Sequence, residues 1–306
     1  MKRLFFTSVL ILLILCFTAC SKPVEKLRIG IIKPSIDHLP LSYALSQNKI
    51  DPSKNEIITF SSGWETQEAL VNNQIDVAII PFTYIWTARS KGFPVKTLSF
   101  FERETDGIVV SKSIKTVSDL NQKKVGVLRA STIDAFLTNY VRKNQISIEP
   151  VYFRTPNEMI AALKAREVSA IVTYVPVIQK LTDEFNVLHW FSEDHPEHPC
   201  CNIAAREYAI QTKYPQLQAF MNVINEAVHN LSQDDSQLIE FMKKTYLLTD
   251  TQAIDALNHS VFRMNLAEKD KQFELKTMQL FKDLKYIDQL PSSDSVYEDR
   301  FIRELP

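Results

Sequence analysis

The sequence predicts an α/β protein with two lobes, and three observations lead to this fold class. Short apolar segments alternate with helical segments through the N-terminal and central parts of the 306 residues, a pattern typical of parallel sheets built from βαβ units. The alternating series occurs twice in succession, which indicates two lobes. A helical segment follows the second series, so we expect it to complete one of them.

The first series begins at residue 27 and ends before residue 107. Continuous apolar runs predict buried strands, and apolar residues three or four positions apart predict helices. The predicted strands are 27–32, 56–60, 76–81 and 95–101, and the predicted helices are 39–47, 64–73 and 82–90.

The second series begins with the apolar segment 107–110. Ser131 and Thr132 stand where a helix N-cap is expected, and Pro156 stands in the first turn of another helix. The predicted helices are therefore 133–143 and 156–166, between strands 124–128, 149–153, 170–173 and 187–190.

Helical spacing dominates the chain after residue 205. The predicted helices are 214–231, 236–246, 250–258 and 266–284. The tail after Pro291 is polar, so we expect it to pack loosely.

The N-terminus has the pattern of a secretory signal. Lys2 and Arg3 precede an almost wholly apolar run, 4–17, which ends in small residues before Cys20. The apolar run is shorter than the ~20 residues that span a bilayer. We therefore predict that residues 1–20 are a signal peptide rather than a membrane helix.

Composition and motifs exclude several function classes. The formal net charge is −1 and no basic stripe is present, which argues against nucleic acid as a partner. The chain has neither a GxGxxG nor a GxxxxGK loop for nucleotides, and no HExxH or Ser-His-Asp arrangement. We therefore predict a protein that is not an enzyme, with no catalytic residues and no cofactor.

Several segments resemble a known family. They are Ala69-Leu70 with Asp76-Val77-Ala78, the stretch 115–127 (KTVSDLNQKKVGV) followed by Ser131-Thr132, and the helix–strand pair 158–163 and 170–172. The chain resembles the type II periplasmic solute-binding proteins of ABC importers, in the branch that binds taurine, alkanesulfonates, nitrate and thiamine-pyrimidine precursors. The resemblance implies two α/β lobes joined by hinge strands, with a solute in the cleft and a C-terminal helical segment. The expected division is 21–108 plus 200–306 for lobe 1 and 109–199 for lobe 2.

The resemblance also implies a location and partners. Thr18-Ala19-Cys20 resembles the bacterial lipobox, which implies that Cys20 is lipidated. The protein would then be a lipoprotein held on a membrane outside the cytoplasm, in the periplasm or at the cell surface, by its lipid chains. It would deliver a small organic or anionic solute to an ABC permease and its ATPase. A sulfonate, a nitrate-like anion and a pyrimidine-type ring all remain open.

Candidate ligand contacts follow from strand ends, because ligands of open α/β sheets bind beyond the carboxyl ends of the strands. Helix N-terminal amides at Ser131 could hold an anionic group, and Arg129 could pair with one. Aromatic side chains would suit a flat ring. The predicted ligand-binding residues are Ser35, His38, Ser61, Ser62, Gly63, Trp64, Phe82, Thr83, Arg129, Ser131, Thr132, Tyr174 and Cys200.

The segment 195–201 (HPEHPCC) is the main alternative. Its histidines and cysteines carry the atoms of a soft metal site. Adjacent cysteines match no known zinc spacing, so we predict no metal ligands. A metal-handling lipoprotein that uses this segment remains an alternative function, as does a thiamine-precursor-type enzyme on the same fold.

Overall fold

The computed structural model of the chain describes residues 25–33, 35–232 and 235–306. The predicted signal peptide 1–20, with the predicted lipidation residue Cys20, lies outside the described residues. Within the described part, no helix is both long enough and apolar enough to cross a membrane.

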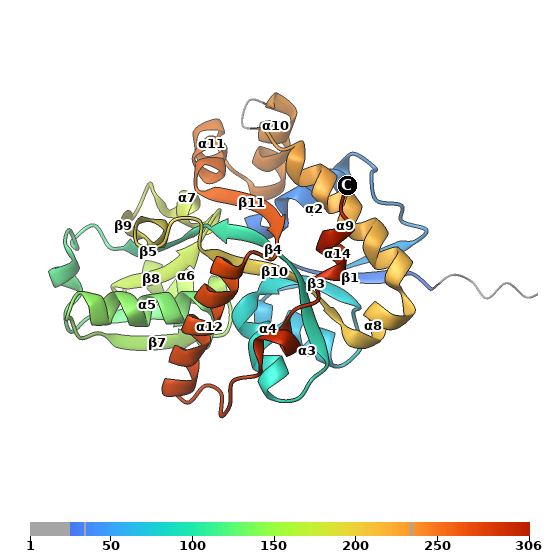
Figure 1. The fold of residues 1–306 in the computed structure, drawn as a ribbon. Coiled ribbons are helices and arrows are strands. Elements are labelled where there is room, and N and C mark those ends of the chain that lie inside the picture. Colours follow the sequence, from blue (N-terminus) through green and yellow to red (C-terminus); the bar gives the residue numbers. More distant parts are fainter. Residues whose placement is uncertain (1–24, 34, 233–234) are drawn as a thin grey trace, which may run out of the picture.

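A six-stranded sheet forms the first lobe, in the order β11-β4-β10-β3-β1-β2 (Figure 1). Strand β1 pairs in parallel with β2 and β3, whereas β10 runs antiparallel to β3 and β4. The strands are β1 (Leu27–Ile32), β2 (Asn55–Phe60), β3 (Val77–Pro81), β4 (Val95–Glu104), β10 (Pro199–Arg206) and β11 (Ser260–Asn265).

A five-stranded sheet forms the second lobe, in the order β7-β6-β8-β5-β9. Strand β6 pairs in parallel with β7 and β8, and β5 runs antiparallel to β8 and β9. The strands are β5 (Asp106–Val110), β6 (Lys124–Leu128), β7 (Glu149–Phe153), β8 (Ala170–Tyr174) and β9 (Asn186–Trp190).

The two sheets share one plan. In each, a strand that enters from the other lobe, β10 or β5, lies between the third and fourth strands of the local series. Strand β4 leads into β5 through Thr105, and β9 returns the chain to β10. Two crossings between two sheets confirm the predicted two-lobed α/β fold with hinge strands.

Helices cover both sheets. Those of the first lobe are η1 (Ile36–His38), α2 (Leu39–Ser46), α3 (Gly63–Val71), α4 (Phe82–Ser90), α8 (Glu207–Thr212), α9 (Tyr214–His229), α10 (Ser236–Tyr246), α11 (Asp250–Asn258), α12 (Glu268–Asp283), α13 (Ser293–Val296) and α14 (Arg300–Arg303). Those of the second lobe are η2 (Val117–Leu120), α5 (Thr132–Lys143), α6 (Pro156–Lys164), α7 (Val177–Leu181) and η3 (Phe191–Glu193).

Side-chain caps explain where the helices next to the cleft begin. The Ser131 hydroxyl accepts a hydrogen bond from the Asp134 amide at the start of α5. Ser62 caps α3 in the same way, through the Glu65 amide. Such caps satisfy amides that the first helical turn leaves without a partner.

The C-terminal segment holds the lobes together. Helix α12 runs between α4 of the first lobe and α5 of the second (Figure 1), and Met278 and Phe281 share an apolar cluster with Trp86 and Ala135. The expectation that the tail after Pro291 packs loosely is wrong. Phe301 is fully buried and stacks on Tyr214 at 4.6 Å between ring centres, because the tail returns to the first lobe.

Candidate functional site

A cavity with a volume of about 40 Å³ lies between the two lobes. It is found at the carboxyl ends of β1, β3, β6 and β8 and at the starts of α3 and α5, where open α/β sheets bind ligands. Its lining comes from both lobes: Ile32, Asp37, Ser62, Gly63, Pro81, Tyr84, Asp106, Leu128, Ser131, Thr132, Ile133, Tyr174, Cys200 and Cys201.

Six of the predicted ligand-binding residues line this cavity: Ser62, Gly63, Ser131, Thr132, Tyr174 and Cys200. The hydroxyl of Ser131 is already engaged, because it also donates to the Leu128 carbonyl at 2.6 Å. The hydroxyl of Thr132 is buried and has no hydrogen-bond partner among the described residues. Thr132 therefore has a free polar atom to offer a ligand.

Gly63 is required by its neighbour Tyr84. A Cβ atom at Gly63 would lie 2.5 Å from Cε2 of Tyr84, which is shorter than any ordinary contact. The absence of a side chain therefore lets the Tyr84 ring reach the cavity.

Two predicted residues near β1 do not line the cavity. The Ser35 hydroxyl accepts from the Asp37 amide at 3.2 Å and caps η1. Nε2 of His38 accepts from the Ile32 amide at 2.9 Å. Burial lowers the pKa of His38 to about 3, so its imidazole is neutral at pH 7 and holds the loop after β1.

Three more predicted residues lie in or near α3 and α4 without reaching the cavity. Trp64 is 58% exposed. Phe82 and Thr83 are fully buried, and Phe82 packs in the apolar cluster beneath α12. Residues that directly follow a strand can point into the core as readily as into the cleft, and the sequence does not distinguish these directions.

The last two predicted residues have their own partners on the surface. Ser61 donates through its amide and its hydroxyl to Glu65, at 3.0 and 2.6 Å. The Arg129 guanidinium lies 5.6 Å from the ring centres of both Tyr152 and Tyr286. No basic side chain is among the described residues that line the cavity.

Buried carboxyl groups are the feature that the sequence analysis missed. Asp37 and Asp106 line the cavity, and Glu102 is fully buried at the end of β4. Burial, with the Asp106 carboxylate nearby, raises the pKa of Asp37 to about 6. Burial also raises the pKa of Asp106, and it raises that of Glu102 well above the usual range. The sequence does contain a sign of this burial, because Glu102 directly follows two phenylalanines, Phe100 and Phe101.

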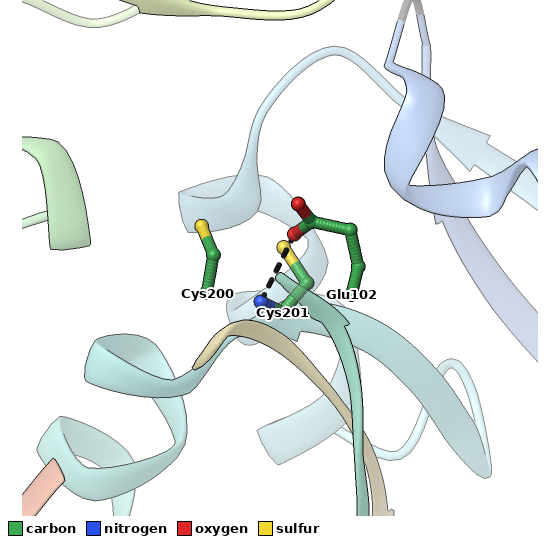
Figure 2. A group of neighbouring side chains, drawn as sticks. All are labelled: Glu102, Cys200 and Cys201. Carbon is green, nitrogen blue, oxygen red and sulfur yellow. Dashed lines mark hydrogen bonds between the residues drawn. The ribbon is translucent and has the colours of Figure 1, made fainter. Parts of the chain in front are cut away.

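Cys200 and Cys201 lie against these carboxyl groups, and both are buried free thiols. Sγ of Cys201 donates to Oδ2 of Asp37 at 3.2 Å, and its amide donates to Oε2 of Glu102 at 3.2 Å. Figure 2 shows both sulfur atoms on the same side of the strand as the Glu102 carboxyl group. Burial raises the pKa of Cys201 well above the usual range, so the free protein holds this thiol protonated at pH 7.

The histidines of segment 195–201 take no part in this group. Nδ1 of His198 donates to the His195 carbonyl at 2.8 Å, and its Nε2 lies 3.6 Å from Oδ2 of Asp106. His195 is exposed. The segment therefore separates into an exposed turn around His195, a buried His198 beside Asp106, and the buried thiol pair.

Comparison with known proteins agrees with this architecture. Residues 56–237 match the family model described as "NMT1/THI5 like". The ligand-binding component of an ABC-type import system from Staphylococcus aureus, solved with zinc bound, has a TM-score of 0.78 at 17% identity and covers 92% of this chain and 99% of its own. The periplasmic aliphatic sulphonate-binding protein SsuA from Escherichia coli has a TM-score of 0.74 at 23% identity, with 90% and 92% covered.

The periplasmic nitrate-binding protein NrtA from Synechocystis has a TM-score of 0.74 at 14% identity, and the match covers 92% of this chain and 88% of that one. No curated protein sequence matches the chain significantly. At these identities the solved structures establish a shared fold. They confirm the predicted resemblance to periplasmic solute-binding proteins.

Proposed function

The chain belongs to the NMT1/THI5-like family, and we propose that it is the solute-binding component of an ABC importer. One observation carries the proposal: the cavity is lined by residues of both lobes, at the strand ends where such folds bind ligands. A solute held from both sides stabilises the closed arrangement of the lobes. The closed form would then dock on a permease and its ATPase, which take the solute onward chemically unchanged.

The charge of the cavity favours one of the solute classes that the sequence left open. Asp37 and Asp106 bring carboxyl groups to it, and its described lining includes no basic residue. Two like charges 4 Å apart repel by about 4 kcal/mol at an effective dielectric constant near 20. This repulsion disfavours a sulfonate or a nitrate-like anion.

We therefore infer that the solute is a pyrimidine-type ring with amino groups, which donates hydrogen bonds or carries a positive charge. Carboxylates accept such hydrogen bonds strongly. Tyr84 and Tyr174 add aromatic rings to the cavity, and Thr132 adds a free hydroxyl. A flat ring that bears polar groups suits this combination.

Membrane attachment through Cys20 forms part of the same proposal. A lipid at the N-terminus would keep the protein near its permease and raise its effective concentration there. In cells fed a labelled fatty acid, we expect the chain to incorporate label and the Cys20→Ser variant to lose it. A labelled Cys20→Ser variant would contradict this assignment.

A thermal unfolding screen tests the solute proposal, with aminopyrimidines, taurine, alkanesulfonates and nitrate as probes. A ligand at one hundred times its dissociation constant stabilises a protein by about 2.7 kcal/mol. We expect the midpoint to rise with an aminopyrimidine and to stay unchanged with the anions. The Asp106→Asn variant should lose the response, whereas Ser61→Ala, outside the cavity, should keep it. A response to sulfonate or nitrate, or recovery of a chemically altered solute, would overturn the proposal.

A further inference from the structure

Three donor groups meet beside the cavity in a way that solute capture does not require. The Glu102 carboxylate oxygen and the sulfur atoms of Cys200 and Cys201 all lie within 4.8 Å of one another, and all three residues are buried (Figure 2). The two cysteines line the cavity, whereas Glu102 does not.

A β-bulge explains why neighbouring cysteines share one side of the strand. Consecutive residues of a regular strand point to opposite faces. In the pairing of β10 with β4, Pro199 lies opposite Arg103 and Cys201 lies opposite Glu102. Cys200 is therefore an extra residue, and such bulges redirect side chains. From the sequence alone, adjacent cysteines match no known zinc spacing. In this bulge, however, both sulfur atoms lie on one side of the strand, where they can reach the same ion.

The Glu102 carboxyl group provides an independent sign of a missing partner. Its Oε2 accepts from the Cys201 amide, whereas its Oε1 is buried without a hydrogen-bond partner among the described residues. Leaving a buried carboxyl oxygen unpaired is costly. A bound cation would remove this cost.

We propose that Glu102, Cys200 and Cys201 form a binding site for a thiophilic metal ion such as Zn²⁺. Sulfur ligands select soft and borderline ions over Mg²⁺ or Ca²⁺. Zn–S bonds of about 2.3 Å place two sulfur ligands of a tetrahedral ion about 3.8 Å apart, so donors within 4.8 Å need only small movements. The Asp37 carboxylate lies 3.2 Å from Sγ of Cys201, next to this group of three donors but not part of it.

Metal binding at this site exchanges protons for the metal ion. Each thiol gives up its proton as its sulfur atom binds the ion, and the Glu102 carboxyl group gives up its own where it is protonated; these protons are released to solvent and no electrons move. The site differs from the 195–201 segment considered from the sequence, because neither histidine of that segment belongs to it. It also goes beyond the proposed function, since it requires no organic solute.

Cadmium binding to the purified, reduced protein tests the site. The background chain carries Cys16→Ser and Cys20→Ser, so that of the four cysteines only Cys200 and Cys201 remain. We expect an ultraviolet thiolate-to-cadmium charge-transfer band that saturates at one ion per chain. Zn²⁺ should suppress the band by competition.

Variants separate the site from adventitious binding. Replacing both remaining cysteines by serine should abolish the band. Glu102→Gln keeps both thiols and the side-chain shape, and it should weaken binding 10–100-fold with the band retained. His195→Ala, on the exposed turn, should leave the affinity unchanged.

The proposal is overturned if the reduced background protein shows no band, or if Glu102→Gln binds as tightly as the background. These results are distinguishable from failure of the proposed function, because the solute screen contains no metal. An aminopyrimidine response without a cadmium band would remove the metal site alone.

Discussion

The two lobes share one strand order but differ in their interiors. The first lobe buries a salt bridge between Arg103 and Asp270, with 2.7 Å between Nη2 and Oδ2. It also buries Glu274, which accepts hydrogen bonds from three side chains. The second lobe also buries acidic side chains, Asp106 and Asp134, but ion pairs within it such as Lys164–Glu184 are exposed.

Chain connectivity accounts for this difference. The second lobe is built mainly from one continuous segment, whereas the first receives β10, α12 and the C-terminal tail from far along the chain. Glu274 of α12 accepts from Trp86 of α4, Asn202 of β10 and Tyr297 of the tail, at 2.7–2.8 Å. Buried polar contacts thus fix the register of distant segments that apolar packing alone would leave free to slide.

The cavity shows the same contrast. The first lobe supplies Asp37 and both thiols, and the second supplies Asp106 together with the hydroxyl groups of Ser131, Thr132 and Tyr174. Each lobe therefore supplies one acidic side chain to the cavity, and only the first supplies thiols.

Removing one member of the buried salt bridge should have the largest effect on stability. Asp270→Ala leaves the Arg103 guanidinium buried without its carboxylate, and such changes cost about 3–5 kcal/mol. Glu184→Ala breaks an exposed pair of the second lobe and should cost less than about 1 kcal/mol. Urea unfolding of both variants measures the difference. Equal losses would mean that the two lobes do not differ in this respect.

Glu274 should make the free energy of unfolding depend on pH. Burial raises its pKa from 4.5 to about 7, so the folded state holds this proton more tightly than the unfolded state. The resulting stabilisation is complete below pH 4.5 and is lost as the pH rises through 7. It amounts to about 3 kcal/mol.

Urea unfolding at pH 5 and pH 8 measures this loss. We expect Glu274→Gln to show a smaller decrease between the two pH values than the unchanged chain. Glu184→Ala should show the same decrease as the unchanged chain. A Glu274→Gln variant with the full decrease would assign the pH dependence to other groups.

Sequence periodicity was sufficient for the fold but only partly sufficient for the site. The strands of the two alternating series, the Ser131 cap and Pro156 at the start of α6 depend on local chemistry, so they could be read from neighbouring residues. Strands β10 and β11 were not predicted, because they pair only with segments far away in the chain. The buried tail could not be predicted, because Phe301 becomes apolar core only through its contact with Tyr214 in a distant helix.

The prediction of the site residues was incomplete for a related reason. Strand ends indicate positions near the cleft, but the direction of each side chain depends on packing, which turns Phe82 into the core. Asp37 lies between Ser35 and His38. The strand-end pattern selected those two residues but not Asp37 itself. Glu102 meets Cys201 through the pairing of β4 with β10. Glu104 and Thr105 then bend the chain into β5 with φ values of 70° and 50°, and non-glycine residues in this region give no sequence signal.

The smallest predicted effect is the loss of a single hydroxyl group, which tests what the second lobe contributes to the cavity. Thr132 and Thr83 both bury a hydroxyl group without a hydrogen-bond partner among the described residues, but only Thr132 lines the cavity. Valine keeps the shape of threonine, so neither Thr132→Val nor Thr83→Val should lower the unfolding midpoint. A hydrogen bond contributes about 0.5–1.5 kcal/mol, so Thr132→Val should weaken aminopyrimidine binding about 2–10-fold, by titration calorimetry. Thr83→Val should leave the affinity unchanged, and equal affinities in both variants would mean that the second lobe contributes no hydroxyl contact there.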